Sequence, residues 1–194
     1  MIDEPQIDDI LAEMNKPAAK KRINSCRKGK RGEREVVHLL MEHFKLPFAK
    51  RPEEFGSGGW STTHEEVQEG LDLDHMAGDI LVPKGFRFCI ENKVGYDIEV
   101  INLFPDANRK RDEKLIDEFI AQAERDSNRV GKEPLVFYRK DYCPIITFFP
   151  TRLMIPNIPL LPILYYKNYT CVSLGMLLSY PRDFFLPGSG IITI

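Results

Sequence analysis

The 194-residue sequence has few cysteines and no long hydrophobic run. Its four cysteines are scattered without the CxxC or CxxH spacing of zinc ligands, and the scatter also argues against a disulfide framework. The most apolar stretch, residues 155–166, contains three prolines and is too short to span a bilayer. The N-terminal residues are acidic, unlike a secretory signal. The sequence therefore predicts a cytoplasmic protein with reduced cysteines and no membrane partner.

The composition is that of a globular protein, and the charge is unevenly placed. Hydrophobic residues make up 43% of the sequence and charged residues 29%, so we expect one domain with a real core and peripheral additions. The net charge is only −2, yet residues 20–34 hold eight basic residues and one acidic residue. This arm carries +7 and the rest of the chain −9. The arm predicts a polyanionic partner, and the alternative is a solvated, flexible tail.

Residues 78–94 place three charged groups inside two apolar runs. Residues 80–82 are typical of a short buried strand, residues 83–85 of a turn and residues 86–94 of a second strand. Asp79 stands where the first strand begins, and Glu91 and Lys93 share one face of the second. Charges beside strand cores are costly unless they are paired or hold a metal. Either Lys93 forms a salt bridge with one carboxylate, or both carboxylates bind Mg²⁺.

The spacing of these residues resembles the PD-(D/E)xK nuclease superfamily. Asp79 is followed, after eleven residues, by Glu91-Asn92-Lys93, and Gly78 stands where the name of the superfamily has Pro. The resemblance implies that Asp79 and Glu91 bind Mg²⁺, for which Mn²⁺ would substitute. It further implies that the backbone carbonyl of Asn92 is another metal ligand and that Lys93 orients the attacking water.

A basic opening and a helix precede the hairpin. Residues 33–44 show a helical apolar stripe, and residues 24–32 are predicted to form a loop. Glu33 would lie in the first turn of the helix, where a carboxylate complements the helix dipole. The run K-G-K-R-G-E-R-E, followed by this helix and the hairpin, resembles the archaeal-type Holliday junction resolvases. That resemblance implies that the basic opening binds backbone phosphates and that Glu33 assists the metal site.

The connection between helix and hairpin is long and polar. Residues 48–51 are predicted as a first strand, and the glycine-rich run 56–59 around Ser57 resembles a Ser-Gly element of the resolvases. Residues 61–75 are an acidic insertion with His64 and His75 near its ends, either a second metal site or a solvated flap. The residues expected to contact DNA are Arg27, Lys28, Lys30, Arg31, Arg34, Arg51 and Ser57.

The second half of the chain completes an α/β pattern. Residues 111–129 have the spacing of an amphipathic helix, and Gln122 falls on it, where related nucleases often have a helpful polar residue. Strands are predicted at 135–139, 145–149 and 168–174, and a short helix at 173–180. The order of elements and the resemblance predict a restriction-endonuclease-like fold, a mixed central sheet flanked by helices. We expect an acidic segment and a basic arm in residues 1–26, a nuclease core in 27–150 and an extension packed on the core in 151–194.

Together these features predict a metal-dependent DNA endonuclease, most like a Holliday junction resolvase that acts on four-way junctions as a homodimer. One alternative is another nuclease of the superfamily, of the restriction or repair kind, acting on linear duplex. The other is a catalytically silent DNA-binding module, which the complete set of Asp79, Glu91 and Lys93 argues against. The apolar run at residues 145–166 either supplies the dimer surface or simply covers the sheet.

Overall fold

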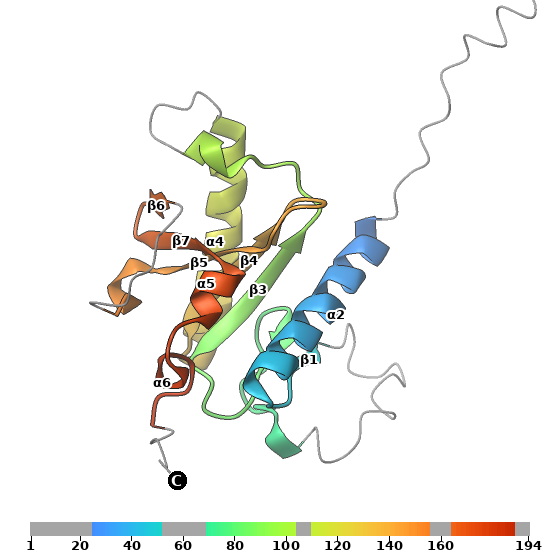
Figure 1. Cartoon of the computed structure of the whole chain (residues 1–194), viewed down its shortest axis with the longest axis vertical. Helices are drawn as coiled ribbons and strands as arrows, with labels where there is room; N and C mark the ends of the chain where they lie inside the picture. The colour runs from blue at the N-terminus through green and yellow to red at the C-terminus, as the bar shows by residue number, and fades with distance from the viewer. Residues whose placement is uncertain (1–24, 52–68, 104–109, 156–163, 189–194) are drawn as a thin grey trace, which may run out of the picture.

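A seven-stranded mixed sheet forms the centre of the protein (Figure 1). The computed structural model describes residues 25–51, 69–103, 110–155 and 164–188. Strands β3 and β4 are parallel, and the other neighbouring strands in the described ranges are antiparallel. Across the sheet the order is β1 (Ala49–Lys50), β2 (Ile80–Leu81), β3 (Phe88–Val94), β4 (Glu133–Arg139), β5 (Ile146–Pro150), β7 (Tyr169–Ser173) and β6 (Leu164–Tyr166).

Helices cover both faces of the sheet (Figure 1). Helix α2 (Ser25–Phe44) packs on one face together with the short helices α5 (Leu174–Leu178) and α6 (Arg182–Phe185). Helix α4 (Lys110–Val130) packs on the opposite face and, after the 3₁₀ turn η1 (Val100–Leu103), connects the parallel strands β3 and β4. This arrangement of helix, sheet and helix confirms the predicted restriction-endonuclease-like class.

Strand β3 presents its residues alternately to the two helical layers. Ile90 is fully buried in the core beneath α2. Glu91 and Lys93 point to the other face, where the Lys93 ammonium lies 5.7 Å from the centroid of the Phe119 ring in α4. Because a parallel strand between two helical layers is covered on both sides, the charges of β3 stand among core residues.

Helix α2 begins about two turns earlier than the sequence predicts. The expected loop is wrong for residues 25–32, because α2 begins at Ser25 and includes both glycines of that stretch. Glu33 therefore lies in the third turn, beyond the reach of the positive end of the helix dipole. A Cβ atom at Gly32 would stand 2.4 Å from a methyl carbon of Val94, so this glycine lets α2 pack against the end of β3.

The elements after the hairpin follow the predicted order. Strands β4 and β5 and helix α4 lie within a few residues of their expected bounds. The predicted C-terminal strand and helix are present as β7 and α5, and Ser173 caps α5 by accepting a hydrogen bond of 3.3 Å from the N–H of Met176. Strand β6 and helix α6 were not predicted. None of the described helices has the length and apolar character that crossing a bilayer requires.

Strand β5 settles one of the two interpretations of the apolar run at residues 145–166. It lies between β4 and β7 and pairs with both. Its residues 147–150 are buried. Because these residues are already buried within the single chain, they cannot form a surface between two protomers, so the dimer interpretation is wrong for this part of the run. The domain division at residue 150 stays a prediction.

Candidate active site

Asp79 directly precedes β2 and is held against β3 by two hydrogen bonds. Its N–H donates to the carbonyl oxygen of Ile90 at 2.8 Å, and its Oδ2 accepts from the N–H of Asn92 at 2.9 Å. Gly78 permits this approach, because it has a φ of +72° and a Cβ atom there would stand 2.4 Å from the carbonyl oxygen of Ile90. Proline, with φ fixed near −65°, cannot adopt this conformation. The presence of Gly78, where the name of the superfamily has Pro, therefore has a local structural reason.

Glu91 is fully buried, with 0% of its surface exposed. Its Oε1 accepts a hydrogen bond from the Lys93 ammonium, whereas its Oε2 is buried and has no hydrogen-bond partner among the described residues. Burial, together with the charge of Asp79, raises the pKa of Glu91 to about 7 against the opposing effect of Lys93. An unpaired carboxylate oxygen in an apolar surrounding is costly, and a bound cation would compensate it. The residues present thus fit a hard metal ion such as Mg²⁺.

Lys93 bridges the strand and the helix that covers it. Its ammonium, whose side chain is only 15% exposed, contacts Glu91 and donates to Oε1 of Gln122 in α4 at 3.1 Å. The ring of Phe119, one helical turn before Gln122, lies beneath the ammonium. The predicted salt bridge with Glu91 is therefore present, and it leaves the second carboxylate oxygen for another partner.

The raised pKa of Glu91 predicts a pH dependence of stability in the metal-free protein. The folded protein holds a proton on Glu91 between the ordinary value of 4.5 and about 7, where the unfolded chain has lost it. The stability that this proton adds to the folded state is fully present below pH 4.5 and is lost as the pH rises through about 7. Relative to Glu91→Gln, the wild-type free energy of unfolding should fall by on the order of 3 kcal/mol over this range.

Urea unfolding in EDTA at pH 5 and pH 8 measures this difference. The Gln variant carries no titrating proton at the position, so subtracting its pH dependence removes the contribution of all other groups. A wild-type protein that loses no more stability than Glu91→Gln between the two pH values would show that the carboxyl titrates normally.

Glu33 is connected to the strand beside Asp79 through a lysine. Its Oε2 lies 3.1 Å from the ammonium of Lys50, and both side chains are mostly buried. Lys50 pairs with Ile80 across β1 and β2, and the N–H of Arg51 donates to the carbonyl oxygen of Asp79 at 3.1 Å. Sequence reasoning found Glu33 through the resemblance but missed Lys50, because only the pairing of β1 with β2 brings it there.

The residues expected to contact DNA are described only in part. Arg31 and Arg34 are exposed on α2, and Arg51 is exposed after β1. Arg31 lies 3.4 Å from Glu35, which also contacts Arg139 at the end of β4. Lys30 is half-buried. The side chains of Arg27 and Lys28, and the whole of Ser57 with its glycine-rich run, lie outside the described residues.

The described end of the acidic insertion is not a solvated flap. Asp72 is 9% exposed, accepts a hydrogen bond of 2.8 Å from Nδ1 of His75 and lies 2.9 Å from the ammonium of Lys132. Burial raises the pKa of Asp72, but the hydrogen bonds from Lys132 and His75 outweigh it and hold the pKa below its ordinary value. His64 lies outside the described residues, which contain no group of three or more His, Cys, Asp or Glu able to hold a metal.

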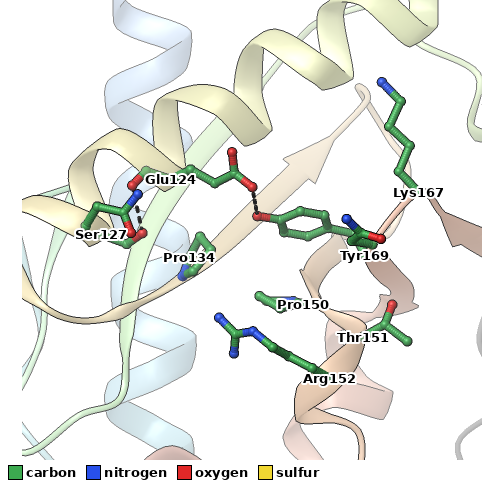
Figure 2. A pocket seen from close by; sticks show the side chains of 10 residues that line it. Glu124, Ser127, Pro134, Pro150, Thr151, Arg152, Lys167 and Tyr169 are labelled. Atoms are coloured by element: carbon green, nitrogen blue, oxygen red, sulfur yellow. Dashed lines mark hydrogen bonds between the residues drawn. The ribbon is translucent and has the colours of Figure 1, made fainter.

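A pocket of about 480 Å³ lies apart from these residues, between α4 and the strands β5 and β7 (Figure 2). Some of its polar side chains are already paired with other side chains. The hydroxyl of Tyr169 donates to Glu124 at 2.8 Å, and Arg152, in the 3₁₀ turn η2 (Thr151–Leu153), forms a two-point ion pair with Glu133. Groups that are already paired are less available to bind a substrate, so the β2–β3 hairpin is the better candidate for an active site.

The fold, with an Asp and a Glu-x-Lys on neighbouring strands of a mixed sheet, defines a protein of the restriction-endonuclease-like class. The model of a family described as "Phage putative PDDEXK endonuclease" matches residues 24–167, and the chain belongs to this family. The match supports the PD-(D/E)xK superfamily and an endonuclease, but it does not extend to the junction resolvases. No curated protein matches the chain.

Proposed function

We propose that the protein is a metal-dependent DNA endonuclease whose active site contains Asp79, Glu91 and Lys93. The buried and unpaired Oε2 of Glu91, beside a second carboxylate, is the observation that carries the proposal. Asp79, Glu91 and the backbone carbonyl of Asn92 would hold Mg²⁺, with Mn²⁺ as a substitute and with water at the remaining positions. A catalytically silent DNA-binding module would have no use for two adjacent carboxylates of which one is fully buried.

The chain supplies position and charge to the hydrolysis of a phosphodiester. When bound, the metal ion supplies Lewis-acid stabilisation of the charge that develops on the phosphoryl oxygens. Lys93 holds the attacking water by a hydrogen bond and favours its ionised form, and its charge offsets that of the transition state. Gln122 keeps the ammonium in place from the side of α4. Glu33 supports the site, because its ion pair with Lys50 fixes β1 beside Asp79.

For the substrate, we propose a four-way DNA junction cut by a symmetric homodimer. The basic opening and Glu33, which resemble the resolvases, support this choice. A four-way junction has approximate two-fold symmetry, and two copies of one site at a fixed separation match its two opposing strands. Linear duplex, as cut by restriction or repair nucleases, is the alternative substrate on the same fold.

Cleavage of three DNAs in Mg²⁺, compared on one denaturing gel, tests the function and its substrate. The DNAs are a four-way junction, a linear duplex and a single strand, all carrying the same sequence. Preferential, paired cutting of the junction supports the resolvase, and light scattering of the complex should then show two protomers. Equal cutting of junction and duplex would favour the general nuclease. If the protein cuts none of the three DNAs in either Mg²⁺ or Mn²⁺, the proposed function is wrong.

The basic residues of α2 should bind the DNA backbone without reading bases. Replacing Arg27, Lys28, Lys30 and Arg31 by Ala should weaken binding to all sequences alike and flatten the slope of log K against log[salt] by about 0.9 for each phosphate that the variant no longer neutralises. The double variant Lys84→Ala, Lys114→Ala is the control, since both side chains are exposed on other elements. Fluorescence anisotropy at several salt concentrations measures the slopes. An unchanged slope in the fourfold variant would instead indicate a solvated arm.

A further inference from the structure

The turn between β4 and β5 carries a tyrosine in a conformation that does not suit it. Tyr142 is fully exposed and has a φ of +61°. The N–H of Cys143 donates to the carbonyl oxygen of Lys140 at 3.1 Å, so Tyr142 is the third residue of a β-turn. A positive φ at that position is typical of a type II turn, which favours Gly or Asn. A bulky aromatic residue there is an outlier that folding does not require, and such outliers point to function.

This turn lies at the same end of the sheet as Lys93. In the parallel pair of β3 and β4, Lys93 stands opposite Tyr138 and Val94 opposite Arg139. The carboxyl ends of the two strands therefore meet, and the β4–β5 turn follows directly. Figure 1 shows the turn beside the end of β3. Glu35 of α2 contacts Arg139 at the same place, so the helix that carries the basic residues borders this end too.

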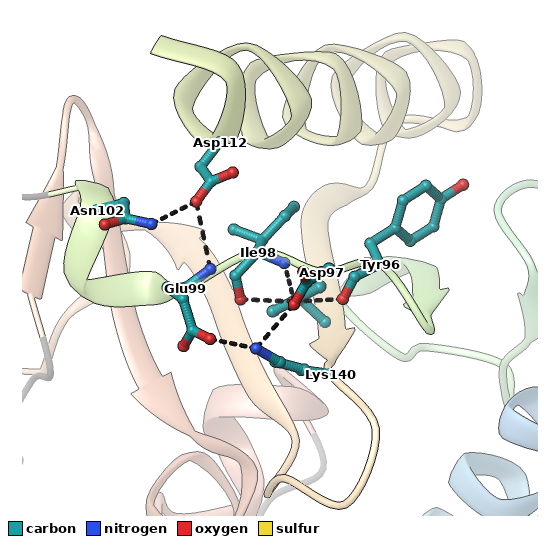
Figure 3. A network of polar contacts seen from close by, with 8 residues as sticks. Tyr96, Asp97, Ile98, Glu99, Asn102, Asp112 and Lys140 are labelled. Atoms are coloured by element: carbon teal, nitrogen blue, oxygen red, sulfur yellow. Dashed lines mark hydrogen bonds and ion pairs between the residues drawn. The ribbon is translucent and has the colours of Figure 1, made fainter. Parts of the chain in front are cut away.

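A second exposed aromatic side chain follows β3. Tyr96 is 42% exposed, and its ring centroid lies 4.8 Å from that of Phe119. The Phe119 ring also lies beneath the ammonium of Lys93, so Tyr96 and Lys93 share one neighbour. Figure 3 shows the ring of Tyr96 turned away from the polar network that holds its backbone. The ring thus has one side against Phe119 and another exposed.

A polar network ties the segment that carries Tyr96 to the base of the β4–β5 turn (Figure 3). Lys140, at the base of the turn, forms ion pairs with Asp97, at 2.8 Å, and with Glu99. The buried hydroxyl of Tyr138 lies 2.9 Å from the carbonyl oxygens of Tyr96 and Ile98, either of which accepts its single proton. The segment that follows β3 is therefore tied to β4 and to the β4–β5 turn. An aromatic side chain on a backbone that is already held in place loses less entropy on binding than one on a free loop.

We propose that Tyr142, with Tyr96 at the same end of the sheet, stacks on nucleobases that are free of pairing next to the scissile phosphate. The inference rests on the proposed function and gives it a source of selectivity. Basic residues contact phosphates in any DNA, whereas an aromatic face binds a base only where the base has left the helical stack. The pair of rings would therefore select DNA with interrupted stacking, such as a branch point or a bulge, over a continuous duplex.

Binding of two DNAs that differ only in two unpaired nucleotides tests this inference. Anisotropy titrations without a divalent metal compare a continuous duplex with the bulged duplex for wild-type protein, Tyr142→Ala, Tyr142→Trp and Tyr165→Ala. Tyr165, in β6 at the far edge of the sheet, is 58% exposed and is the matched control. Tyr142→Ala should weaken binding to the bulged DNA about 10-fold and binding to the duplex less than about 2-fold. Tyr142→Trp and Tyr165→Ala should bind both DNAs as the wild type does.

The outcomes separate this inference from the proposed function. Equal binding of both DNAs by the wild type, or an equal loss on both DNAs in Tyr142→Ala, would overturn the stacking site even if the wild type cuts DNA in Mg²⁺. A selective loss in Tyr142→Ala would support it even in a protein that cuts nothing. Thermal unfolding serves as the folding control, since the fully exposed ring of Tyr142 contributes little to the core. Tyr142→Gly, which also relieves the positive φ, should reproduce the selective loss without loss of stability.

Discussion

Asp79→Asn, Glu91→Gln and Lys93→Ala should each reduce DNA cleavage by about a thousandfold or more while folding and DNA binding survive. Asp79 and Glu91 would each lose a charged oxygen ligand, and without Lys93 the water would lose its positioning charge. Phosphate contacts elsewhere on the surface are unaffected, so the affinity for DNA should stay within about 2-fold. Initial rates of cleavage in Mg²⁺ and anisotropy titrations in EDTA measure the two effects separately.

A nearby carboxylate provides the control for these substitutions. Asp74 precedes Asp79 by five residues and is exposed, so Asp74→Asn should cut DNA at nearly the wild-type rate. An inactive Asp74→Asn variant would mean that the wrong carboxylate had been assigned to the site. Full activity in Glu91→Gln would exclude the proposed metal ligand set altogether.

Gly78→Pro, which would restore the residue in the name of the superfamily, should prevent folding. Proline cannot reach the φ of +72° that residue 78 adopts, and its ring would collide with the backbone of Ile90. Gly78→Ala should already cost more than about 3 kcal/mol, because the added Cβ would stand 2.4 Å from a backbone carbonyl oxygen that β3 holds in place. Urea unfolding followed by circular dichroism measures both variants.

Gly85 separates the two causes of this instability. It also has a positive φ, +77°, but no heavy atom lies within 4 Å of where its Cβ would be, apart from those of its chain neighbours. Gly85→Ala therefore measures the conformational cost alone, about 1–2 kcal/mol. Gly78→Ala should be clearly less stable. Equal stability of the two alanine variants would show that β3 can yield at Ile90, and the tight approach of Asp79 would then need another cause.

Local patterns predicted the elements that carry the chemistry. The alternation of Glu91 and Lys93 in an apolar run placed both on one face of β3, and the turn at residues 83–85 implied its antiparallel partner. These features depend on neighbours in the sequence, which is why they could be predicted. The first turns of α2 could not, since residues 25–32 are mostly polar or glycine and leave no apolar stripe.

Contacts between distant segments explain the rest of what the sequence did not reveal. Gly32 looked like a loop residue, and only the crossing of α2 over Val94 gives it a place inside a helix. Nothing in the sequence distinguishes Lys50 from the other lysines. Only the pairing of β1 with β2 brings it to Glu33. Asp72 resembled the acidic residues around it, but in the fold it is buried and forms an ion pair with Lys132, which directly precedes β4.

The shortness of the β2–β3 hairpin also affects how long the folded protein survives. Asp79 and Glu91 are joined across one tight turn, so little loop entropy opposes their meeting. Gln122, 29 residues beyond Lys93, reaches the site only when α4 packs on the sheet. We therefore expect the two carboxylates to meet while water still surrounds them, and to lose that water in a late step. Repulsion between Asp79 and Glu91 that develops after the folding transition state speeds unfolding and hardly slows folding. Without a cation, the active site thus shortens the lifetime of the folded state more than it delays its formation.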